Sequence, residues 1–194
     1  MKKREFLKTG GAVAAAMSFP LTVQAQGATY NWKMATGWGG GPLTDLGTKE
    51  FADKLEQFSG GRFKIQIFPG GALGNALKVP ETVKNGIADL GHTWIGWDWG
   101  KDPTTVLFGG YAGSFDSERM LHWLYSAGGI DMQRKYRDQT DEIISMPLFI
   151  RTAEAFLHSR KPVRTLNDLK GLKLRTAGAW LEMSKDLGAA PVTT

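Results

Sequence analysis

Strand-like and helix-like segments alternate along this chain, and glycine or proline separates each from the next. Tyr30–Thr36 and 63–67 alternate apolar with polar residues as strands do, whereas 43–58 places apolar residues at helical spacing. Near the C-terminal end, a short strand that finishes at Arg175 leads into a helix over 179–187. Strands that alternate with helices form layered α/β folds. The sequence therefore predicts an α/β protein.

The middle of the chain predicts further elements of both kinds. A helix is predicted over 76–85, and the proline at position 80 indicates either a kink there or a helix that starts near Pro80. Asp116 can cap a further helix that runs to about Ser126. The remaining predictions are a helix over 130–140 and strands over 88–93, 143–150 and 153–158.

The first 25 residues have the features of an export signal. A basic start (1–8) precedes a short run of small and apolar residues (9–17), and Val23-Gln-Ala25 resembles a cleavage site. The order Lys3-Arg4 resembles a twin-arginine signal with lysine in the first place, which leaves the twin-arginine and general routes both open. We expect residues 1–25 to be a signal peptide and the mature protein to be periplasmic.

Charge and cysteine content exclude several classes of function. The net charge is +5, but residues 1–25 hold four cations against one glutamate, so only about +2 belongs to the remainder. That balance gives no reason to expect a nucleic-acid partner. The chain has no cysteine, which excludes disulfides, thiolate metal sites and a cysteine nucleophile.

Motifs for catalysis or metal binding are also missing from the sequence. There is no G-x-S-x-G elbow, no H-E-x-x-H and no phosphate-binding loop, because Gly39-Gly-Gly41 lacks the Gly-Lys-Ser/Thr that would follow. The histidines at 92, 122 and 158 lack metal-ligand spacing. The sequence predicts no catalytic residue, no metal ligand and no enzyme activity.

Arg175 is the strongest candidate for a ligand-binding residue. It ends a predicted strand, and Thr176-Ala-Gly178 leads directly into a helix. Ligands of open α/β sheets bind beyond the carboxyl ends of strands, and a guanidinium can hold a carboxylate with two parallel hydrogen bonds. The alternative is a surface ion pair, and position alone does not separate the two.

Aromatic residues also follow predicted strands. Trp38 lies in a glycine-rich loop after the first strand, and His92-Thr-Trp-Ile-Gly-Trp-Asp-Trp99 follows another. These positions suit the walls of a small-ligand site, although packing in the core or between domains is the alternative for each ring. The candidate ligand-binding residues here are Trp38, His92, Trp94 and Trp97.

Three stretches of the chain resemble the solute-binding proteins of tripartite ATP-independent periplasmic (TRAP) transporters. They are Gly86-Ile-Ala-Asp-Leu-Gly-His92, Gly100-Lys-Asp-Pro103 with Phe108 and 123–129, and Asp168-Leu-Lys-Gly-Leu-Lys-Leu-Arg175 with Leu187-Gly-Ala-Ala-Pro191. The resemblance runs from about Tyr30 to the last residue. It is closest to the branch that binds 2-oxo acids and other monocarboxylates.

The resemblance implies a two-lobed α/β fold that closes on its ligand like a hinge. The first lobe would span 26–150, and 151–194 would begin a second lobe that is incomplete in this chain. Arg175 would hold the carboxylate of a 2-oxo acid, hydroxy acid or dicarboxylate. Glu154 would contact the ligand from the strand that crosses between lobes, where the branch more often has glutamine.

The resemblance also implies partners. They are a small organic carboxylate and the membrane subunits of the transporter, with a ligand-bridging cation and a homodimer as open points for the full-length protein. No chemistry on the ligand is expected. A binding module of a sensor or of another transporter class stays open, and so, less favoured, does a periplasmic enzyme that acts on carboxylic acids.

Overall fold

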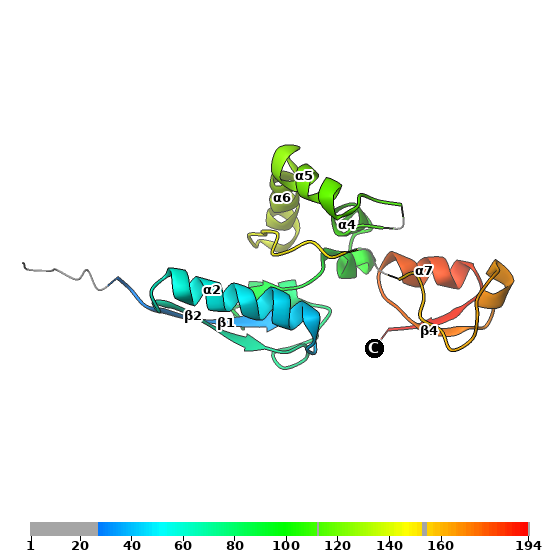
Figure 1. The fold of residues 1–194 in the computed structure, drawn as a ribbon, viewed down its shortest axis with the longest axis horizontal. Coiled ribbons are helices and arrows are strands. Elements are labelled where there is room, and N and C mark those ends of the chain that lie inside the picture. Colours follow the sequence, from blue (N-terminus) through cyan, green and yellow to red (C-terminus); the bar gives the residue numbers. More distant parts are fainter. Residues whose placement is uncertain (1–26, 112, 153–154, 194) are drawn as a thin grey trace, which may run out of the picture.

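The computed structural model describes residues 27–111, 113–152 and 155–193, and their strands form two separate sheets. The first sheet has three parallel strands in the order β2-β1-β3, and the second pairs β4 with β5 in parallel. Figure 1 shows the first sheet in blue to green and the second in orange to red, apart from each other along the molecule. The predicted α/β class is confirmed.

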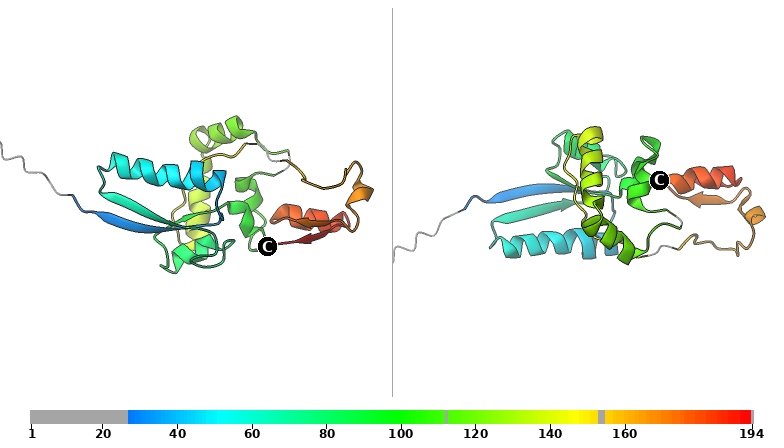
Figure 2. Two further views of the ribbon diagram at one scale, coloured as in Figure 1. Left: turned by 60° about the horizontal axis from the view of Figure 1, so that its bottom comes forward. Right: turned by 90° about the horizontal axis from the view of Figure 1, so that it is seen from above.

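The central strand of the first sheet is β1, which pairs with β2 on one side and β3 on the other. The connecting helices lie on opposite faces of the sheet, with α2 against β2 and α3 against β3 (Figure 2). Right-handed crossovers give this arrangement. Beneath α3, Ala35 packs with Val79 and Ala88, all of them buried. The elements are β1 (Tyr30–Thr36), the π-helical η1 (Leu43–Lys49), α2 (Glu50–Phe58), β2 (Phe63–Phe68), α3 (Val79–Lys84) and β3 (Leu90–His92).

Parallel pairing brings the carboxyl ends of these strands to one edge of the sheet. The register places Thr36 of β1 beside His92 of β3, and Ala35 beside Phe68 of β2. Loops that leave these ends are therefore neighbours in space, although they are tens of residues apart in sequence.

Helices follow the first sheet and form a separate layer. Asp116 caps α5 as predicted, since its Oδ1 accepts a hydrogen bond from Arg119 N at 2.8 Å. Helices α5 and α6 pack against each other, and α4 packs against η2. The elements are η2 (Ile95–Gly100), α4 (Thr105–Gly109), α5 (Ser117–Ser126) and α6 (Gly129–Asp141).

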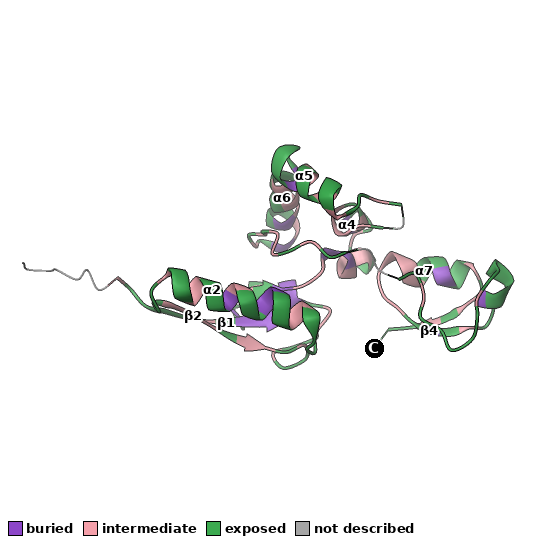
Figure 3. Cartoon of the chain, viewed as in Figure 1, coloured by how far each residue is buried: buried purple, intermediate pink, exposed green. Residues whose placement is uncertain are grey.

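The second sheet, with one helix, forms the C-terminal unit. Figure 3 shows that few of its residues are buried, and they include Leu169, Leu174 and Ser184. Its elements are η3 (Leu166–Leu169), β4 (Lys173–Arg175), α7 (Ala179–Asp186) and β5 (Ala190–Val192). The lobe boundary near residue 150 stays a prediction.

The predicted strand over 143–150 is wrong, because this stretch pairs with neither sheet. Its apolar side chains pack elsewhere: Ile144 stays exposed, whereas the ring of Phe149 lies against His92. The predicted strand over 153–158 is not observed at 155–158, and its first two residues lie outside the described part of the chain. The predicted signal peptide lies outside it as well.

No helix in the described part of the chain is long and apolar enough to span a bilayer.

Candidate functional site

At the carboxyl ends of β1 and β3, aromatic side chains come together around one buried imidazole. The indole Nε1 of Trp38 lies 3.1 Å from His92 Nδ1, and Thr48 Oγ1 lies 2.6 Å from the same nitrogen. Phe149 meets the imidazole edge-to-face with ring centroids 5.5 Å apart. We call this group, together with Trp94 and Trp97, the aromatic cluster: Trp38, His92, Trp94, Trp97 and Phe149.

The stretch Gly86-Ile-Ala-Asp-Leu-Gly places His92 through contacts of its own. Asp89 fixes β3 to β1, because its Oδ2 accepts from Lys33 N at 2.8 Å and its N–H donates to Lys33 O at 3.0 Å. A Cβ on Gly91 would lie 2.6 Å from Val79 Cγ1, so only glycine lets α3 pack this closely on β3. The next residue, His92, is then delivered to the edge of the sheet.

The hydrogen bonds around His92 define its protonation state. An indole N–H can only donate, so the ring nitrogen that receives it must be an unprotonated acceptor; Trp38 Nε1 lies 3.1 Å from Nδ1 and 3.4 Å from Nε2. Burial lowers the pKa of His92 to about 4. The imidazole is therefore neutral at ordinary pH and serves as a fixed acceptor that orients Trp38.

The tryptophans of η2 and its N-terminal flank complete the cluster. The Trp97 ring lies 4.6 Å from that of Trp38, and a Cβ on Gly37 would fall 2.1 Å from Trp97 Cζ3. Trp94 donates from Nε1 to Gly109 O at 2.8 Å and covers Gly96. Trp94 therefore takes part in packing, and all four candidate rings predicted from the sequence lie in one neighbourhood.

Arg175 stands at the carboxyl end of β4, as predicted, and its side chain is exposed. The turn that follows it reaches the aromatic cluster: a Cβ on Gly178 would lie 2.8 Å from Gly96 O and 3.6 Å from Trp94 Cζ3. Gly178 has φ 66° and ψ −149°, a conformation essentially reserved for glycine. The strand end that carries Arg175 and the turn that carries Trp94 thus approach each other.

The motif before Arg175 builds a rigid support for it. Asp168 Oδ2 accepts hydrogen bonds from Arg164 N, Thr165 N and Thr165 Oγ1, and these bonds lower the pKa of Asp168. Leu174 is buried below the strand, and Thr176 N donates to Val192 O at 3.0 Å. Arg175 therefore projects from a strand that pairs with β5 along one edge and is anchored by the buried side chain of Leu174.

Two of the sequence expectations have no structural counterpart here. Glu154 lies outside the described residues. In the described part of the chain, no group of three or more histidine or acidic side chains is placed to hold a metal ion. The ligand-bridging cation is thus assigned to no residue and stays an expectation of the resemblance.

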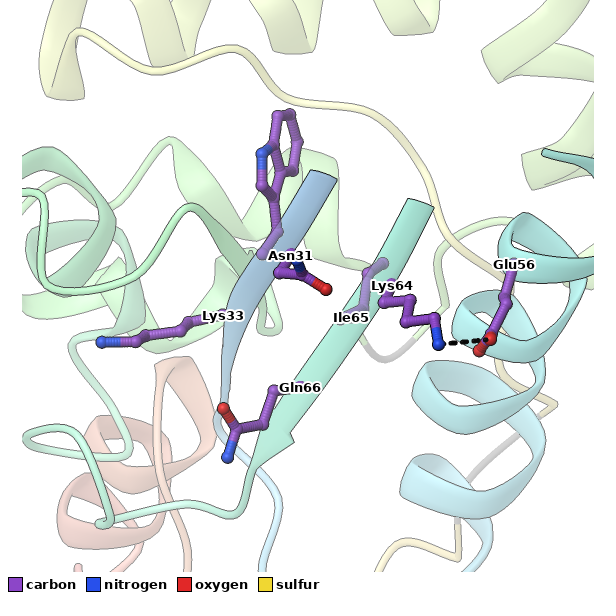
Figure 4. Close-up of a pocket in the computed structure, with 7 residues that line it drawn as sticks. Asn31, Lys33, Glu56, Lys64, Ile65 and Gln66 are labelled. Carbon is purple, nitrogen blue, oxygen red and sulfur yellow. Dashed lines mark ion pairs between the residues drawn. The ribbon is translucent and has the colours of Figure 1, made fainter. Parts of the chain in front are cut away.

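A broad hollow of about 460 Å³ lies elsewhere on the first sheet. Figure 4 shows its lining, where Lys64 pairs with Glu56 at 3.5 Å and Asn31, Lys33 and Gln66 project from β1 and β2. These residues precede the carboxyl ends of their strands. The hollow is therefore separate from the aromatic cluster and forms no part of the candidate site.

Sequence reasoning missed two residues that hold the cluster together. Thr48 is fully buried and bonds His92 across 44 positions, and Phe149 packs on Gly47, where a Cβ would lie 2.3 Å from its ring. Neither position carried a signal in the sequence, since threonine in a helix and phenylalanine in an apolar run are common features.

Comparison with known proteins decides the family. The model of bacterial extracellular solute-binding protein, family 7 (DctP) matches residues 34–194. This chain belongs to that family. The resemblance to TRAP solute-binding proteins, inferred from three stretches of sequence, is therefore confirmed.

Solved structures and a curated protein are similar to this chain. A TRAP periplasmic solute-binding protein from Pseudoalteromonas atlantica, solved with sodium and pyruvate, aligns with a TM-score of 0.71 and 28% identity over 86% of this chain and 50% of its own. One from Colwellia psychrerythraea, solved with calcium and pyruvate, aligns with the same TM-score and identity over 86% and 51%. A monocarboxylate 2-oxoacid-binding periplasmic protein from Nostoc sp. is 30% identical over 97% of this chain and 53% of its own length.

This family 7 chain thus spans about half the length of the relatives it matches. The family has a two-lobed α/β fold. This chain contains the part of that fold which the alignments cover.

Proposed function

We propose that the protein is the extracytoplasmic solute-binding subunit of a TRAP transporter and captures a small organic carboxylate in the periplasm. Arg175 holds the carboxylate, and the aromatic cluster forms the opposite wall. The bound, closed form then docks on the membrane subunits of the transporter, with no chemistry on the ligand.

The observation that carries this proposal is the approach of Gly178 to Gly96. It brings the turn after Arg175 against the turn that holds Trp94, which supports a site bordered by this cation and by the rings of the cluster. A planar guanidinium matches a carboxylate with two parallel hydrogen bonds, and aromatic walls exclude the water that would weaken them.

The relatives support the ligand class. Their names and bound ligands include 2-oxo acids, with pyruvate in both of the solved structures described above. Pyruvate is small and planar, with a carboxylate beside a carbonyl, and suits a site with one arginine and flat walls. We therefore propose 2-oxo acids as the first candidates, ahead of hydroxy acids and dicarboxylates. Glu154, if it contacts the ligand, would influence the choice among them.

The test is calorimetric titration of the protein, in the full length in which the cell makes it, with 2-oxo acids, 2-hydroxy acids and dicarboxylates. Arg175→Ala should raise the Kd of the best acid roughly 30-fold or more, because a bidentate charged contact is lost. Arg62→Ala is the matched control, since Arg62 is an exposed arginine before β2, at the opposite end of the first sheet. Equal affinity of the two variants would show that Arg175 does not bind the ligand. If none of the acids binds, the proposed ligand class is wrong.

A further inference from the structure

A group of charges, largely buried except for Lys101, adjoins Trp97 of the aromatic cluster along the chain. Arg137 of α6 is 3% exposed, and its Nη1 lies 2.6 Å from Asp98 Oδ2 and 2.6 Å from Asp141 Oδ2. Lys101 Nζ forms a close ion pair with Asp141 Oδ1. Two cations thus face two carboxylates, and the group is neutral as a whole.

The group joins two elements that carry different parts of the fold. Asp98 lies in η2 between Trp97 and Trp99, whereas Arg137 and Asp141 lie one turn apart on α6. Lys101, directly after η2, makes a second link to the same helix. The turn that holds the tryptophans is therefore fixed to α6 by charge at two places.

Energetics argue that this arrangement serves geometry more than stability. Buried ion pairs lose hydration and often contribute little net stability compared with apolar residues of similar volume. Burial raises the pKa of Asp98 despite the opposing effect of Arg137, which shows that ionised Asp98 is poorly solvated here. Among the described residues, Asp98 Oδ2 also receives no well-directed hydrogen bond, so Arg137 holds it as an ion pair alone.

The ring next to Asp98 has little freedom to move. Trp97 is packed over Gly37 and lies 4.6 Å from Trp38, so a small rotation of η2 would change the wall of the cluster. Arg137 is too buried to touch a ligand itself. Its effect on binding must pass through η2.

We propose that Arg137 is a positioning residue, which holds Asp98 and thereby sets the orientation of Trp97 in the ligand-binding wall. The effect of Arg137 on ligand affinity rests on the proposed function. The effect of Arg137 on the orientation of Trp97 can be measured without a ligand, so the positioning role and the proposed function can fail separately.

The test compares Asp98→Asn with Asp102→Asn. Both changes remove one carboxylate charge from the same segment. Asp102 accepts hydrogen bonds from Thr104 N and Oγ1 and from the hydroxyl of Tyr136 on α6, so it is a control for a contact with α6 that does not involve Arg137. Arg137→Lys approaches the contact with Asp98 from α6 and keeps the buried positive charge, so it should fold even if another variant does not.

Two measurements are made on folded protein. Closely spaced indoles give coupled circular-dichroism bands that depend on their mutual orientation, and Trp97→Phe identifies the bands of the Trp38–Trp97 pair. Calorimetry gives the Kd of pyruvate. We expect Asp98→Asn and Arg137→Lys to change the coupled bands and raise the Kd roughly 10-fold, and Asp102→Asn to change neither.

A fall in the unfolding midpoint of Asp98→Asn and Arg137→Lys with unchanged indole bands would overturn the proposal, because it would leave these residues a purely structural role. Changed bands with unchanged pyruvate affinity would overturn the effect on binding. If the unsubstituted protein binds no carboxylate, the proposed function fails, and the indole bands still decide whether Arg137 positions Trp97.

Discussion

Replacing His92 with asparagine removes a titratable ring from the aromatic cluster and keeps an acceptor oxygen near the position of Nδ1. In the folded protein His92 is buried, and its Nδ1 accepts the N–H of Trp38 at 3.1 Å. A second proton on the ring would place two donors against each other and would charge a ring in an apolar setting. Folding therefore favours the neutral form of His92.

The amount of stability that is lost at low pH follows from the pKa of His92. Burial lowers it from 6.5 to about 4 in the folded chain. Above the unfolded value the contribution to stability is fully present, since neither state binds the proton. As pH falls from 6.5 towards 4, the unfolded chain takes up a proton that the folded chain refuses, and about 3 kcal/mol of stability is lost.

Urea unfolding of the protein and of His92→Asn at about pH 7.5 and about pH 4.5 measures this loss. The carboxylates titrate equally in both proteins, so their contribution cancels when the stability changes of the two proteins are subtracted. We expect the free energy of unfolding to fall by roughly 2–3 kcal/mol more in the unsubstituted protein than in His92→Asn. His122→Asn, which removes an exposed histidine of α5, is the control and should behave like the unsubstituted protein. A difference between the protein and His92→Asn that is independent of pH would refute a buried, neutral His92.

Two further substitutions test the packing that holds the site. Gly178→Ala should reduce the free energy of unfolding by about 1–3 kcal/mol through backbone strain, and it should also weaken ligand binding, because its Cβ would lie 2.8 Å from Gly96 O. Gly61→Ala is the control, since Gly61 has φ 78° with nothing near its Cβ, and this change should reduce stability alone. Equal ligand affinity of the two variants, measured by calorimetry, would contradict the contact between Gly178 and Gly96. Met34→Ala should cost about 2–5 kcal/mol in urea unfolding, because Met34 is 3% exposed in the central strand, and a cost under about 1 kcal/mol would show that the site is not packed as described.

Local patterns predicted most of the regular elements correctly. Alternation located β1 and β2, and helical spacing located α2, because each of these segments has one face that must be buried. The cap at Asp116 located α5, and a helix over 130–140 matches α6. Helices η2 and α4 were missed, since tryptophan and glycine dominate that region and leave no clear period. Their presence depends on packing around Trp94, which no local pattern records.

The stretch 143–150 shows the limit of such patterns for strands. Its apolar residues satisfy the rule for a strand, but a strand also needs a neighbour with free hydrogen-bonding groups. Here Ser145 bonds Gln133 of α6 through its side chain, and Phe149 packs on His92. Side-chain contacts thus take the place that strand pairing would fill.

The candidate site was predictable where it depends on strand ends. Trp38 follows β1 and His92 ends the neighbouring parallel strand β3, so the topology alone brings them together. Thr48 and Arg137 were not predictable, because the contact that links each of them to the region of the site is to a residue about 40 positions away. A single sequence contains no record of such pairs.

Three rings of the aromatic cluster also pack on a residue without a side chain. Trp97 lies on Gly37, Phe149 on Gly47 and Trp94 on Gly96, with an imagined Cβ 2.1–2.4 Å from each ring. Backbone beneath a ring cannot change rotamer, so these walls are less adaptable than walls packed on flexible side chains. A site of this kind should discriminate ligands by shape. Enlarging any one of these glycines should therefore change which carboxylate binds best, and not merely how tightly all of them bind.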